Sequence, residues 1–343
     1  MNFTMARPGR RARPEMAGPL TLPQFGLGTA GLGNLYEAVS DIEAGAALAS
    51  ARALGFSYLD TAPFYGHGLS EQRLGRYLQS ANWQPQLSTK VGRVLDPVGE
   101  GALPDHGFAD PAPFAPHFDY SAAGVERSFG ESCERLGVGR DDILLLHDIG
   151  RLTHGADHPR ILSQALNEAL PAMAAIKARG GARAIGLGVN EWQVCEEVLA
   201  HQPLDVILLA GRYTLFEHED TLGFLNDCAQ AGVGVIAGGA FNSGLLASPE
   251  GQSAKYDYVD APQSALERVA ALRAVCTRHG VSLPAAALHF CTAHPAIWSV
   301  IPGVQNAAHV TDAKGFIDEE IPAALWAELK ERGLIAAACP VPQ

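Results

Sequence analysis

The chain has 343 residues, of which 47% are apolar and 37 are glycine, and its formal net charge at neutral pH is −12. An acidic chain of this kind is a poor match for nucleic acid or an anionic membrane as its main partner, because both require a basic surface. No apolar run approaches the ~20 residues of a membrane span, whereas the apolar content suffices for one large buried core.

The N-terminal segment differs from the rest of the chain. Residues 1–17 contain four arginines and no apolar stretch of the length found in a signal peptide. We expect this segment to be a disordered leader. Residues 18–343 are expected to form one domain without an internal boundary.

Short apolar stretches typical of strands alternate with stretches typical of helices. The expected strands cover residues 25–28, 56–60, 86–90, 143–147, 182–189, 204–210, 233–239 and 297–303. The expected helices cover residues 41–54, 70–79, 121–137, 161–179, 191–200, 219–230, 264–279 and 284–293. Strict alternation predicts a parallel sheet covered by helices. Eight repeats favour an α/β fold closed into a (β/α)₈ barrel, the TIM-barrel architecture.

Three of the connecting segments bear on function. The stretch GLGTAGLG at 26–33 has the spacing of a dinucleotide-binding glycine motif, but a long loop rather than a helix follows it, so we do not interpret it as a Rossmann fold. Residues 91–120 and 240–263 are longer than usual connections from strand to helix. Long loops after barrel strands lie at the mouth of the barrel, where we expect them to shape a substrate pocket.

Four polar residues fall at or just beyond the ends of neighbouring strands. Asp60, Lys90 and His147 end three of them, and Tyr65 follows Asp60 in the stretch SYLDTAPFYGHG at 57–68. In a barrel these strand ends converge on one mouth, so residues distant in sequence can meet there.

Together the four residues suit proton transfer at a carbinol or carbonyl. Lowering a tyrosine pKa by about three units takes ~4 kcal/mol, which one ammonium at ~4 Å supplies at an effective dielectric near 20. We expect Lys90 to lower the pKa of Tyr65, Asp60 to hold Lys90, and His147 to orient the reacting oxygen. Taken singly, the Asp–Lys pair could be a structural ion pair and the tyrosine a packing residue.

The segments around these residues resemble the signature regions of the aldo-keto reductase superfamily. They read GFSYLDTAPFYGHGLSEQRLG, LSTKVGR, DILLLHD, IGLGVNEW and VIPGVQNAAHV, and the resemblance spans about residues 20–335. It implies a (β/α)₈ barrel that binds NAD or NADP without a Rossmann domain. It also implies a catalytic tetrad of Asp60, Tyr65, Lys90 and His147, in which Tyr65 is the acid or base.

The resemblance further implies a set of cofactor-binding residues. Asn190 matches a residue that binds the nicotinamide carboxamide, and Tyr213 matches an aromatic residue that stacks on the ring. The remaining matches form three groups: Gly28, Thr29, Ala30 and Asp60 near the first strands; Gly238, Gly239, Phe241, Ser243, Gly244 and Leu245 around the pyrophosphate; and Pro302, Gly303, Val304, Gln305, His309 and Asp312 around the adenosine. Many members carry a lysine or arginine around 303–309 that binds the 2′-phosphate of NADP. This chain has GVQNAAH there, so we expect NAD to be preferred.

Within the superfamily the chain resembles a bacterial branch that contains L-fucose (D-threo-aldose) 1-dehydrogenases, L-galactose dehydrogenase-like enzymes and pyridoxal 4-dehydrogenase. The expected function is oxidation of an aldose at C1 to the lactone. The expected substrate pocket contains Asn34, Tyr36, Tyr65, His147 and Trp192, although Trp192 could instead be a packing residue. Alternatives are pyridoxal 4-dehydrogenase, an NADPH-dependent aldehyde reductase, and a cofactor-sensing regulatory protein. The sequence leaves the oligomeric state open.

Neither the cysteines nor the histidines form a disulfide or metal-binding pattern. The six cysteines include no CxxC pair, which is typical of free thiols in a reducing cytoplasm. The histidines of HFCTAH at 289–294 and of HGADH at 154–158 lack zinc spacing. We therefore expect a cytoplasmic protein without a metal site, whose partner is a small molecule.

Overall fold

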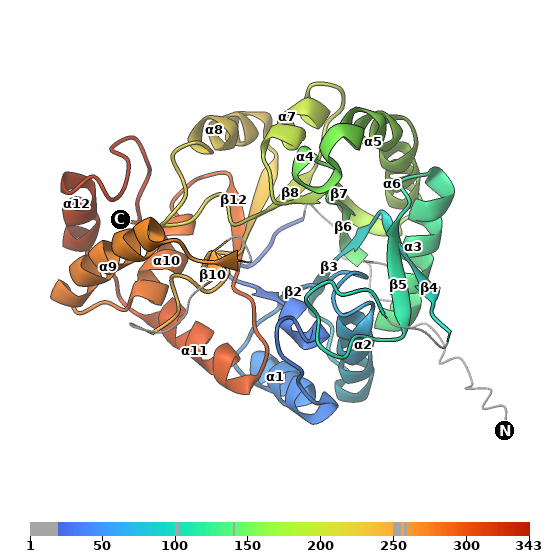
Figure 1. Ribbon diagram of the computed structural model, residues 1–343, viewed down its shortest axis with the longest axis horizontal. Coiled ribbons are helices and arrows are strands. Elements are labelled where there is room, and N and C mark those ends of the chain that lie inside the picture. The colour runs from blue at the N-terminus through green and yellow to red at the C-terminus, as the bar shows by residue number, and fades with distance from the viewer. Residues whose placement is uncertain (1–19, 100–102, 140, 250–254, 257–258) are drawn as a thin grey trace.

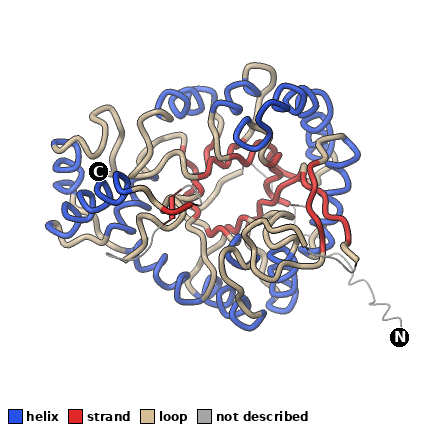
Figure 2. Tube along the Cα trace, in the orientation of Figure 1, coloured by secondary structure: helices blue, strands red, loops and turns tan. Residues whose placement is uncertain are grey.

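The computed structural model describes residues 20–99, 103–139, 141–249, 255–256 and 259–343, so the expected leader at 1–17 lies outside the described residues. Eight described strands form one parallel sheet that surrounds the central axis of the molecule (Figures 1 and 2). In sheet order they are β1 (Leu27–Gly28), β2 (Tyr58–Asp60), β3 (Gln86–Val91), β6 (Asp141–His147), β7 (Ala182–Val189), β8 (Val206–Ala210), β9 (Gly234–Gly238) and β12 (Ile297–Ile301).

The sheet closes on itself between its first and last strands. Parallel bridges join Phe25 to Val300 and Gly28 to Gly303. Because closure removes both sheet edges, the chain forms the predicted (β/α)₈ barrel.

Helices surround the strands (Figure 1). They are α1 (Asp41–Ala53), α2 (Leu69–Ala81), α3 (Ala122–Leu136), α4 (Arg151–His154), α5 (His158–Gln164), α6 (Leu170–Ala178), α7 (Gln193–Leu199), α8 (Leu222–Ala231), α9 (Gln263–Arg278), α10 (Leu283–Cys291), α11 (Ala307–Asp318) and α12 (Ala323–Glu331). Among the described residues, no helix combines the length and apolar character required to cross a membrane.

Two apolar layers explain the uninterrupted apolar run of β6. Ile143 and Leu145 pack with residues of other strands in one cluster, whereas Leu144 and Leu146 belong to the larger cluster shared with the helices. Successive side chains of a strand point to opposite faces, so both faces of β6 are buried. This burial is why the strand does not alternate between apolar and polar residues.

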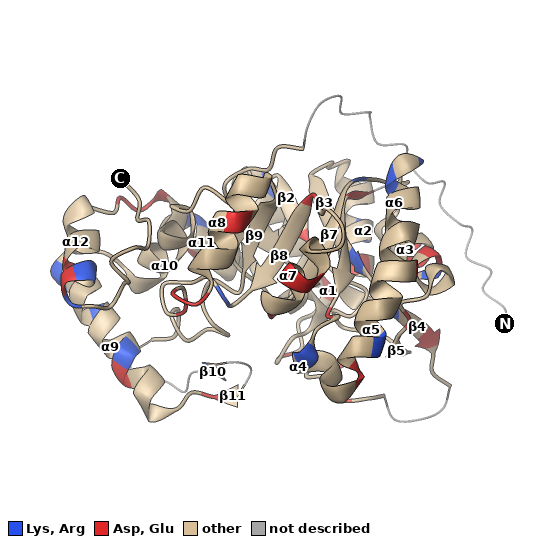
Figure 3. Cartoon of the chain, turned by 90° about the horizontal axis from the view of Figure 1, so that it is seen from above, with Lys and Arg blue, Asp and Glu red and all other residues tan. Residues whose placement is uncertain are grey.

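The long loops contain structure that the sequence analysis did not predict. Within 91–120, β4 (Arg93–Pro97) pairs antiparallel with β5 (Phe114–Phe118). Within 240–263, β10 (Lys255–Tyr256) pairs with β11 (Val259–Asp260). Figure 3 shows both hairpins and α4 at the same end of the barrel. The two long loops therefore lie at one end, as expected.

Two helical features also differ from expectation, and a third agrees with it. The expected helix at 161–179 consists of α5, a π-helical turn at Ala165–Ala169, and α6. Pro171, at the start of α6, has no N–H for the regular ladder, which accounts for the irregular turn. The helices α11 and α12 were not predicted. A 3₁₀ turn at Ala30–Gly33 follows β1, so the glycine motif does not begin an α-helix.

Candidate active site

Asp60, Tyr65 and Lys90 meet in one hydrogen-bonded group at the carboxyl ends of β2 and β3. The Lys90 ammonium donates to Asp60 Oδ2 at 2.8 Å and to the Tyr65 hydroxyl at 3.0 Å. It also donates to the backbone oxygen of Thr61 at 2.9 Å, so three acceptors surround its three protons. The structure thus brings these predicted residues together, with the amine and the phenol in direct contact.

Buried hydroxyl groups hold the Asp60 carboxylate in place. Ser88 Oγ donates to Asp60 Oδ1 at 2.6 Å, and the Tyr58 hydroxyl lies 2.8 Å from Ser88 Oγ. Thr29 Oγ1 donates to the Asp60 backbone oxygen at 2.8 Å. Groups other than Lys90 therefore fix the orientation of Asp60, as a preorganised site requires.

The pKa values in this group differ in part from expectation. Burial raises the pKa of the Tyr65 hydroxyl above its ordinary value, and Lys90 offsets this only in part. Burial disfavours the Lys90 charge, but Asp60 and Tyr65 outweigh it and hold the pKa of Lys90 above its usual range. The expectation that Lys90 makes Tyr65 more acidic than free tyrosine is wrong as a net effect, because desolvation is the larger contribution.

His147 ends β6 and lies beside Tyr65. The two rings meet edge to face with centroids 6.2 Å apart. Burial lowers the pKa of His147 to about 3; Asp148 opposes this shift, and Arg93 and Lys90 reinforce it. The imidazole is therefore neutral at physiological pH, and its Nδ1 atom is buried without a partner among the described residues.

Two further charged residues adjoin His147 and were not predicted as site residues. The Arg93 Nη2 atom, from the start of β4, donates to Asp148 Oδ2 at 2.6 Å. That same carboxylate oxygen is 3.5 Å from His147 Nε2. The Arg93 guanidinium lies over the ring of Phe64, 3.8 Å from its centroid. Phe64 immediately precedes Tyr65, so the hairpin of the long loop reaches the catalytic end of the barrel.

The predicted cofactor segments after β1 and β12 lie against each other. Gly28 N donates to Pro302 O at 2.9 Å, and Val304 N donates to Gly28 O at 3.0 Å. The side chains of Pro302 and Val304 are buried, whereas Gly303 is exposed and a Cβ on it would meet no atom within 4 Å. His309 and Asp312 are exposed on α11, and Gln305 Nε2 donates to the Glu37 backbone oxygen at 3.2 Å.

The predicted pyrophosphate loop has a left-handed backbone. Asn242, Ser243 and Gly244 have φ values of 47°, 58° and 95°. Gly239 is exposed and Phe241 is half-buried. Gly238 and Leu245 are buried, so these two residues can offer a ligand little besides their backbone atoms. No lysine or arginine occurs in 238–245 or 302–313, so these two segments can offer the phosphates backbone N–H groups and uncharged donors but no cationic side chain.

These segments fit a dinucleotide at one further point. Asn190 follows β7, is half-buried, and its side-chain amide has no hydrogen-bond partner among the residues described. Its backbone oxygen is held by Arg212 Nε at 2.8 Å. A side-chain amide that has both a donor and an acceptor available matches a nicotinamide carboxamide. The half-buried Ala30 lies in the turn after β1.

Two cofactor assignments are contradicted by the structure. Tyr213 is 2% exposed, its ring packs on Phe290, and its hydroxyl is 3.6 Å from Cys339 Sγ. A ring enclosed in the helix-covered core cannot stack on a nicotinamide, so this prediction is wrong. Thr29 is fully buried, and its hydroxyl bonds to the Asp60 backbone and to Ser70 at 2.9 Å. Its side chain supports the site from behind and does not face a ligand.

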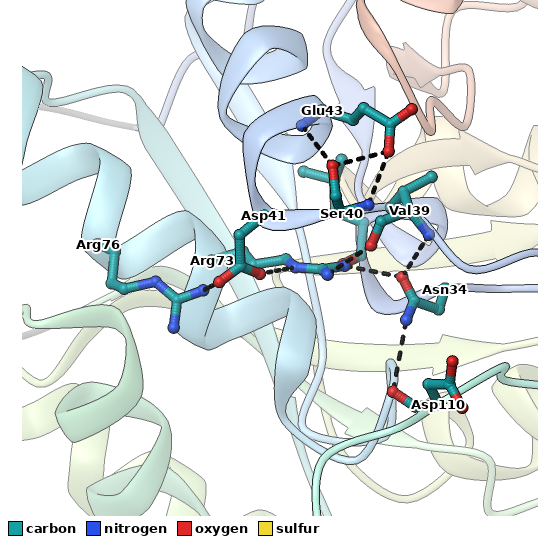
Figure 4. Close-up of polar contacts among 9 residues, drawn as sticks. Asn34, Val39, Ser40, Asp41, Glu43, Arg73, Arg76 and Asp110 are labelled. Atoms are coloured by element: carbon teal, nitrogen blue, oxygen red, sulfur yellow. Dashed lines mark hydrogen bonds and ion pairs between the residues drawn. The ribbon is translucent and has the colours of Figure 1, made fainter.

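The predicted substrate residue Asn34 is a structural residue (Figure 4). It is 3% exposed and has a left-handed φ of 67°. Its Oδ1 accepts from Arg73 Nη1 at 2.8 Å and from Val39 N at 3.1 Å, and its Nδ2 donates to Asp110 O at 3.4 Å. All polar atoms of the side chain are occupied within the protein, so the substrate prediction for Asn34 is wrong.

The other two predicted substrate residues lie apart from this network. Tyr36 is 49% exposed. Burial raises the pKa of its hydroxyl, and a hydrogen bond with Ser243 opposes this rise in part. That contact joins the loop after β1 to the predicted pyrophosphate loop. Trp192 precedes α7, and its ring stacks on Phe224 at 6.1 Å between centroids. A packing role thus explains Trp192 in part.

Trp192 also lines a cavity of about 730 Å³ formed by the loops after β6, β7 and β8. Arg151, Glu191, Arg212 and Arg268 contribute to its walls, and none of the tetrad residues does. Within the part of the chain that is described, no cluster of three metal-ligating side chains occurs.

Comparison with known proteins is consistent with this geometry. The chain matches the model of the Aldo/keto reductase family over residues 24–333. Pyridoxal 4-dehydrogenase of Microbacterium luteolum is 38% identical over 328 residues, which cover 92% of this chain and 96% of the relative. D-threo-aldose 1-dehydrogenase of a Pseudomonas species is 40% identical over 328 residues, which cover 93% of this chain and 96% of the relative.

Solved structures with lower sequence identity share the fold. An aldo-keto reductase from Bacillus halodurans in its holo form has a TM-score of 0.69 at 22% identity, with 92% of this chain and 93% of that chain covered. The glycerol dehydrogenase of Gluconobacter oxydans has a TM-score of 0.70 at 19% identity, with 94% of each chain covered. At these identities the likeness establishes the barrel architecture alone.

Proposed function

Because this chain belongs to the aldo-keto reductase family and is therefore an oxidoreductase, we propose that it oxidises the C1 hydroxyl of an aldose such as L-fucose to the lactone with NAD. The observation that carries the proposal is the 3.0 Å contact between the Lys90 ammonium and the Tyr65 hydroxyl. The 40% identity to D-threo-aldose 1-dehydrogenase supports an aldose as the substrate.

In this reaction the chain's own residues handle one proton and one oxygen. Tyr65 takes the proton of the C1 hydroxyl, and Lys90 stabilises the phenolate from which that step begins. Asp60 keeps Lys90 charged and in place. Neutral His147 offers a hydrogen bond to the same oxygen without changing its own charge. NAD, when bound, would supply the acceptor for the hydride of C1, and loss of this hydride together with the hydroxyl proton would convert C1 into the lactone carbonyl.

The cofactor would lie across the segments that meet at the barrel mouth. Asn190 would bind the carboxamide, the left-handed loop at 239–244 the pyrophosphate, and the start of α11 the adenosine. The preference for NAD is supported by charge. Residues 302–313 contain no lysine or arginine, and Asp312 is exposed on α11, where a 2′-phosphate would meet a like charge.

The direct test is the Tyr65→Phe variant, assayed with L-fucose under saturating NAD. Loss of the phenol removes the acid–base group, so we expect kcat to fall by ~10²–10⁴-fold. Cofactor affinity, measured by quenching of protein fluorescence, is expected to stay within about threefold. Turnover close to that of the wild type would refute Tyr65 as the base.

A second candidate substrate is pyridoxal, which is favoured by the 38% identity to pyridoxal 4-dehydrogenase. Parallel assays with L-fucose and pyridoxal, each with NAD and NADP, separate the two. A dominant rate with NADPH and simple aldehydes would instead identify an aldehyde reductase. Cofactor binding without turnover of any of these compounds would favour a cofactor-sensing protein.

A further inference from the structure

Arg93 and Asp148 form a mostly buried ion pair next to the reacting end of the site. Their side chains are 12% and 13% exposed, and Nη2 of Arg93 is 2.6 Å from Oδ2 of Asp148. Asp148 Oδ2 is also 3.5 Å from Nε2 of His147, the nitrogen to which we assign the reacting oxygen. A group that hydrogen-bonds to Asp148 would therefore lie within a few ångströms of that oxygen.

The surroundings of Arg93 leave only the edge of its guanidinium available. The rings of Phe64 and Phe118 lie 3.8 Å and 4.3 Å from its central carbon, as measured to their centroids. Arg93 Nε is buried, and no hydrogen-bond partner for it exists among the described residues. An unsatisfied buried N–H group is costly, so its retention calls for an explanation such as a ligand atom.

The backbone at Asp148 is held in an unusual conformation. Its φ is 51°, in the left-handed region that disfavours residues other than glycine. The Tyr120 hydroxyl lies 2.8 Å from Asp148 O and 2.9 Å from His147 O, and so holds this turn. Strain that the surrounding structure maintains is found most often at functional sites. Here it sets a carboxylate beside His147.

The pair thus offers one carboxylate and a row of N–H donors beside the position of the reacting oxygen. A hydroxyl group both donates and accepts a hydrogen bond, so it can use both members of the pair at once. Oxygen atoms on neighbouring carbons are separated by about one hydrogen-bond length, ~2.7–3.2 Å. Two such oxygen atoms can therefore contact two protein atoms that lie a few ångströms apart, and His147 Nε2 and Asp148 Oδ2 are separated by 3.5 Å.

We propose that Arg93 and Asp148 bind the hydroxyl group on the carbon next to the reacting carbon, and that they thereby select hydroxylated substrates over plain aldehydes and alcohols. This inference rests on the oxidoreductase function proposed above. It assigns a specificity role to the hairpin formed by β4 and β5, which supplies both Arg93 and Phe118.

The test compares L-fucose with 2-deoxy-L-fucose, which lacks only the hydroxyl next to C1, under saturating NAD. For the wild type, we expect the ratio of kcat/KM with L-fucose to kcat/KM with 2-deoxy-L-fucose to be at least about ten, because the analogue leaves buried polar groups unpaired. In Asp148→Ala and Arg93→Met this ratio is expected to fall toward one. A wild-type ratio near one overturns the proposal without any variant.

Asp96→Asn is the matched control. Asp96 also contacts an arginine and a histidine, Arg127 at 2.8 Å and His117 at 3.2 Å, but it is 52% exposed on the same hairpin. Its substitution should leave the ratio as in the wild type. Equal losses on both substrates in Asp148→Ala would mean that Asp148 acts through His147 or the fold, and would overturn the proposal.

Two further measurements keep the outcome decisive. If the single variants unfold at lower temperature, the double variant Arg93→Met/Asp148→Leu removes both charges together and avoids an uncompensated buried charge. Its ratio is expected to be near one as well, and a ratio as in the wild type overturns the proposal. If L-fucose is not oxidised at all, the proposed aldose function is wrong. Glyceraldehyde and butanal are then compared in the reductive direction, where equal kcat/KM values overturn the present inference separately.

Discussion

The Lys90→Met variant tests the central electrostatic relationship of the site. Methionine keeps most of the volume of the lysine stem but removes the ammonium that lies 3.0 Å from the Tyr65 hydroxyl. Two unit charges ~4 Å apart interact by about 4 kcal/mol at an effective dielectric near 20, which corresponds to about three pKa units. Water at the mouth reduces this interaction, but its loss removes the contribution that lowers the pKa of Tyr65, so we expect the apparent pKa of Tyr65 to rise in the variant.

The sign of the effect on rate follows from the proposed role of Tyr65 as a base in oxidation. The value of kcat/KM rises with pH as the phenol ionises, and it levels off above the apparent pKa of the free enzyme. In Lys90→Met this rise should move to higher pH. The assay is NADH absorbance with L-fucose across the pH range, with cofactor affinity measured separately.

A double variant separates charge from structural damage. In Lys90→Met the buried Asp60 carboxylate loses its 2.8 Å partner, which typically costs about 3–5 kcal/mol of stability. In Lys90→Met/Asp60→Asn no uncompensated charge remains. The double variant should therefore be more stable than the single variant. It should also show a smaller rise in the pKa of Tyr65, because the Asp60 charge that raises this pKa is absent. A pH profile that is the same in both variants and in the wild type would refute the reasoning.

Three further predictions concern other parts of the site. Burial lowers the pKa of His147 to about 3, so its contribution to the free energy of unfolding is complete above pH ~6.5 and is lost as the pH falls, by at most about 1.4 kcal/mol per pH unit. In chemical denaturation between pH 6 and 4, the His147→Asn variant should therefore lose less stability than the wild type. Equal slopes of unfolding free energy against pH in the two proteins would contradict this. Asn34→Gly keeps the left-handed backbone but removes the contacts to Arg73 and Asp110, so it should lower the melting temperature while KM changes less than about threefold; a large rise in KM at unchanged stability would restore Asn34 as a substrate residue. Ala308→Arg places a cation in the exposed first turn of α11 and should lower the Kd for NADP by about tenfold while the Kd for NAD stays constant. Both Kd values are measured by titration with the cofactor, and an unchanged Kd for NADP would indicate that the adenosine binds elsewhere.

The barrel and the tetrad are predictable from sequence for the same reason. The strand signal of a segment such as ILLLH at 143–147 is local, and eight such signals in alternation with helices leave few possible folds. Once the strands are placed, the barrel brings their carboxyl ends together. The positions of Asp60, Lys90 and His147 therefore follow from where their strands end, without any knowledge of side-chain packing.

Arg93 and Asp148 could not be found in this way. The strand β5 contains Pro116, which normally argues against a strand, and its partner β4 is separated from it by residues 98–113. The sequence of this region therefore predicts a loop, and no local signal aims Arg93 at the barrel. Asp148 lies one residue beyond the end of β6, and only its left-handed backbone turns it beside His147.

The errors at Asn34 and Tyr213 have a different cause. Each was assigned from its position relative to a motif or a strand end, which gives the location of the backbone but not the direction of the side chain. Asn34 bonds to Arg73, a residue 39 positions away, and Tyr213 bonds to Cys339, 126 positions away. Such long-range partners decide whether a polar group faces a ligand or the protein, and a single sequence does not reveal them.

The charges around the reacting oxygen assign different tasks to Tyr65 and His147. Burial lowers the pKa of His147 to about 3, with a smaller contribution from the nearby cations Arg93 and Lys90, so its imidazole is neutral near neutral pH. A neutral imidazole can donate a hydrogen bond, which supports the orienting role proposed for His147 rather than that of the acid. Tyr65 differs because Lys90 contacts its hydroxyl directly and stabilises the ionised form, although burial opposes it. Two ion pairs, Lys90 with Asp60 and Arg93 with Asp148, thus support our proposal that Tyr65 is the group of this cluster whose proton moves during the reaction.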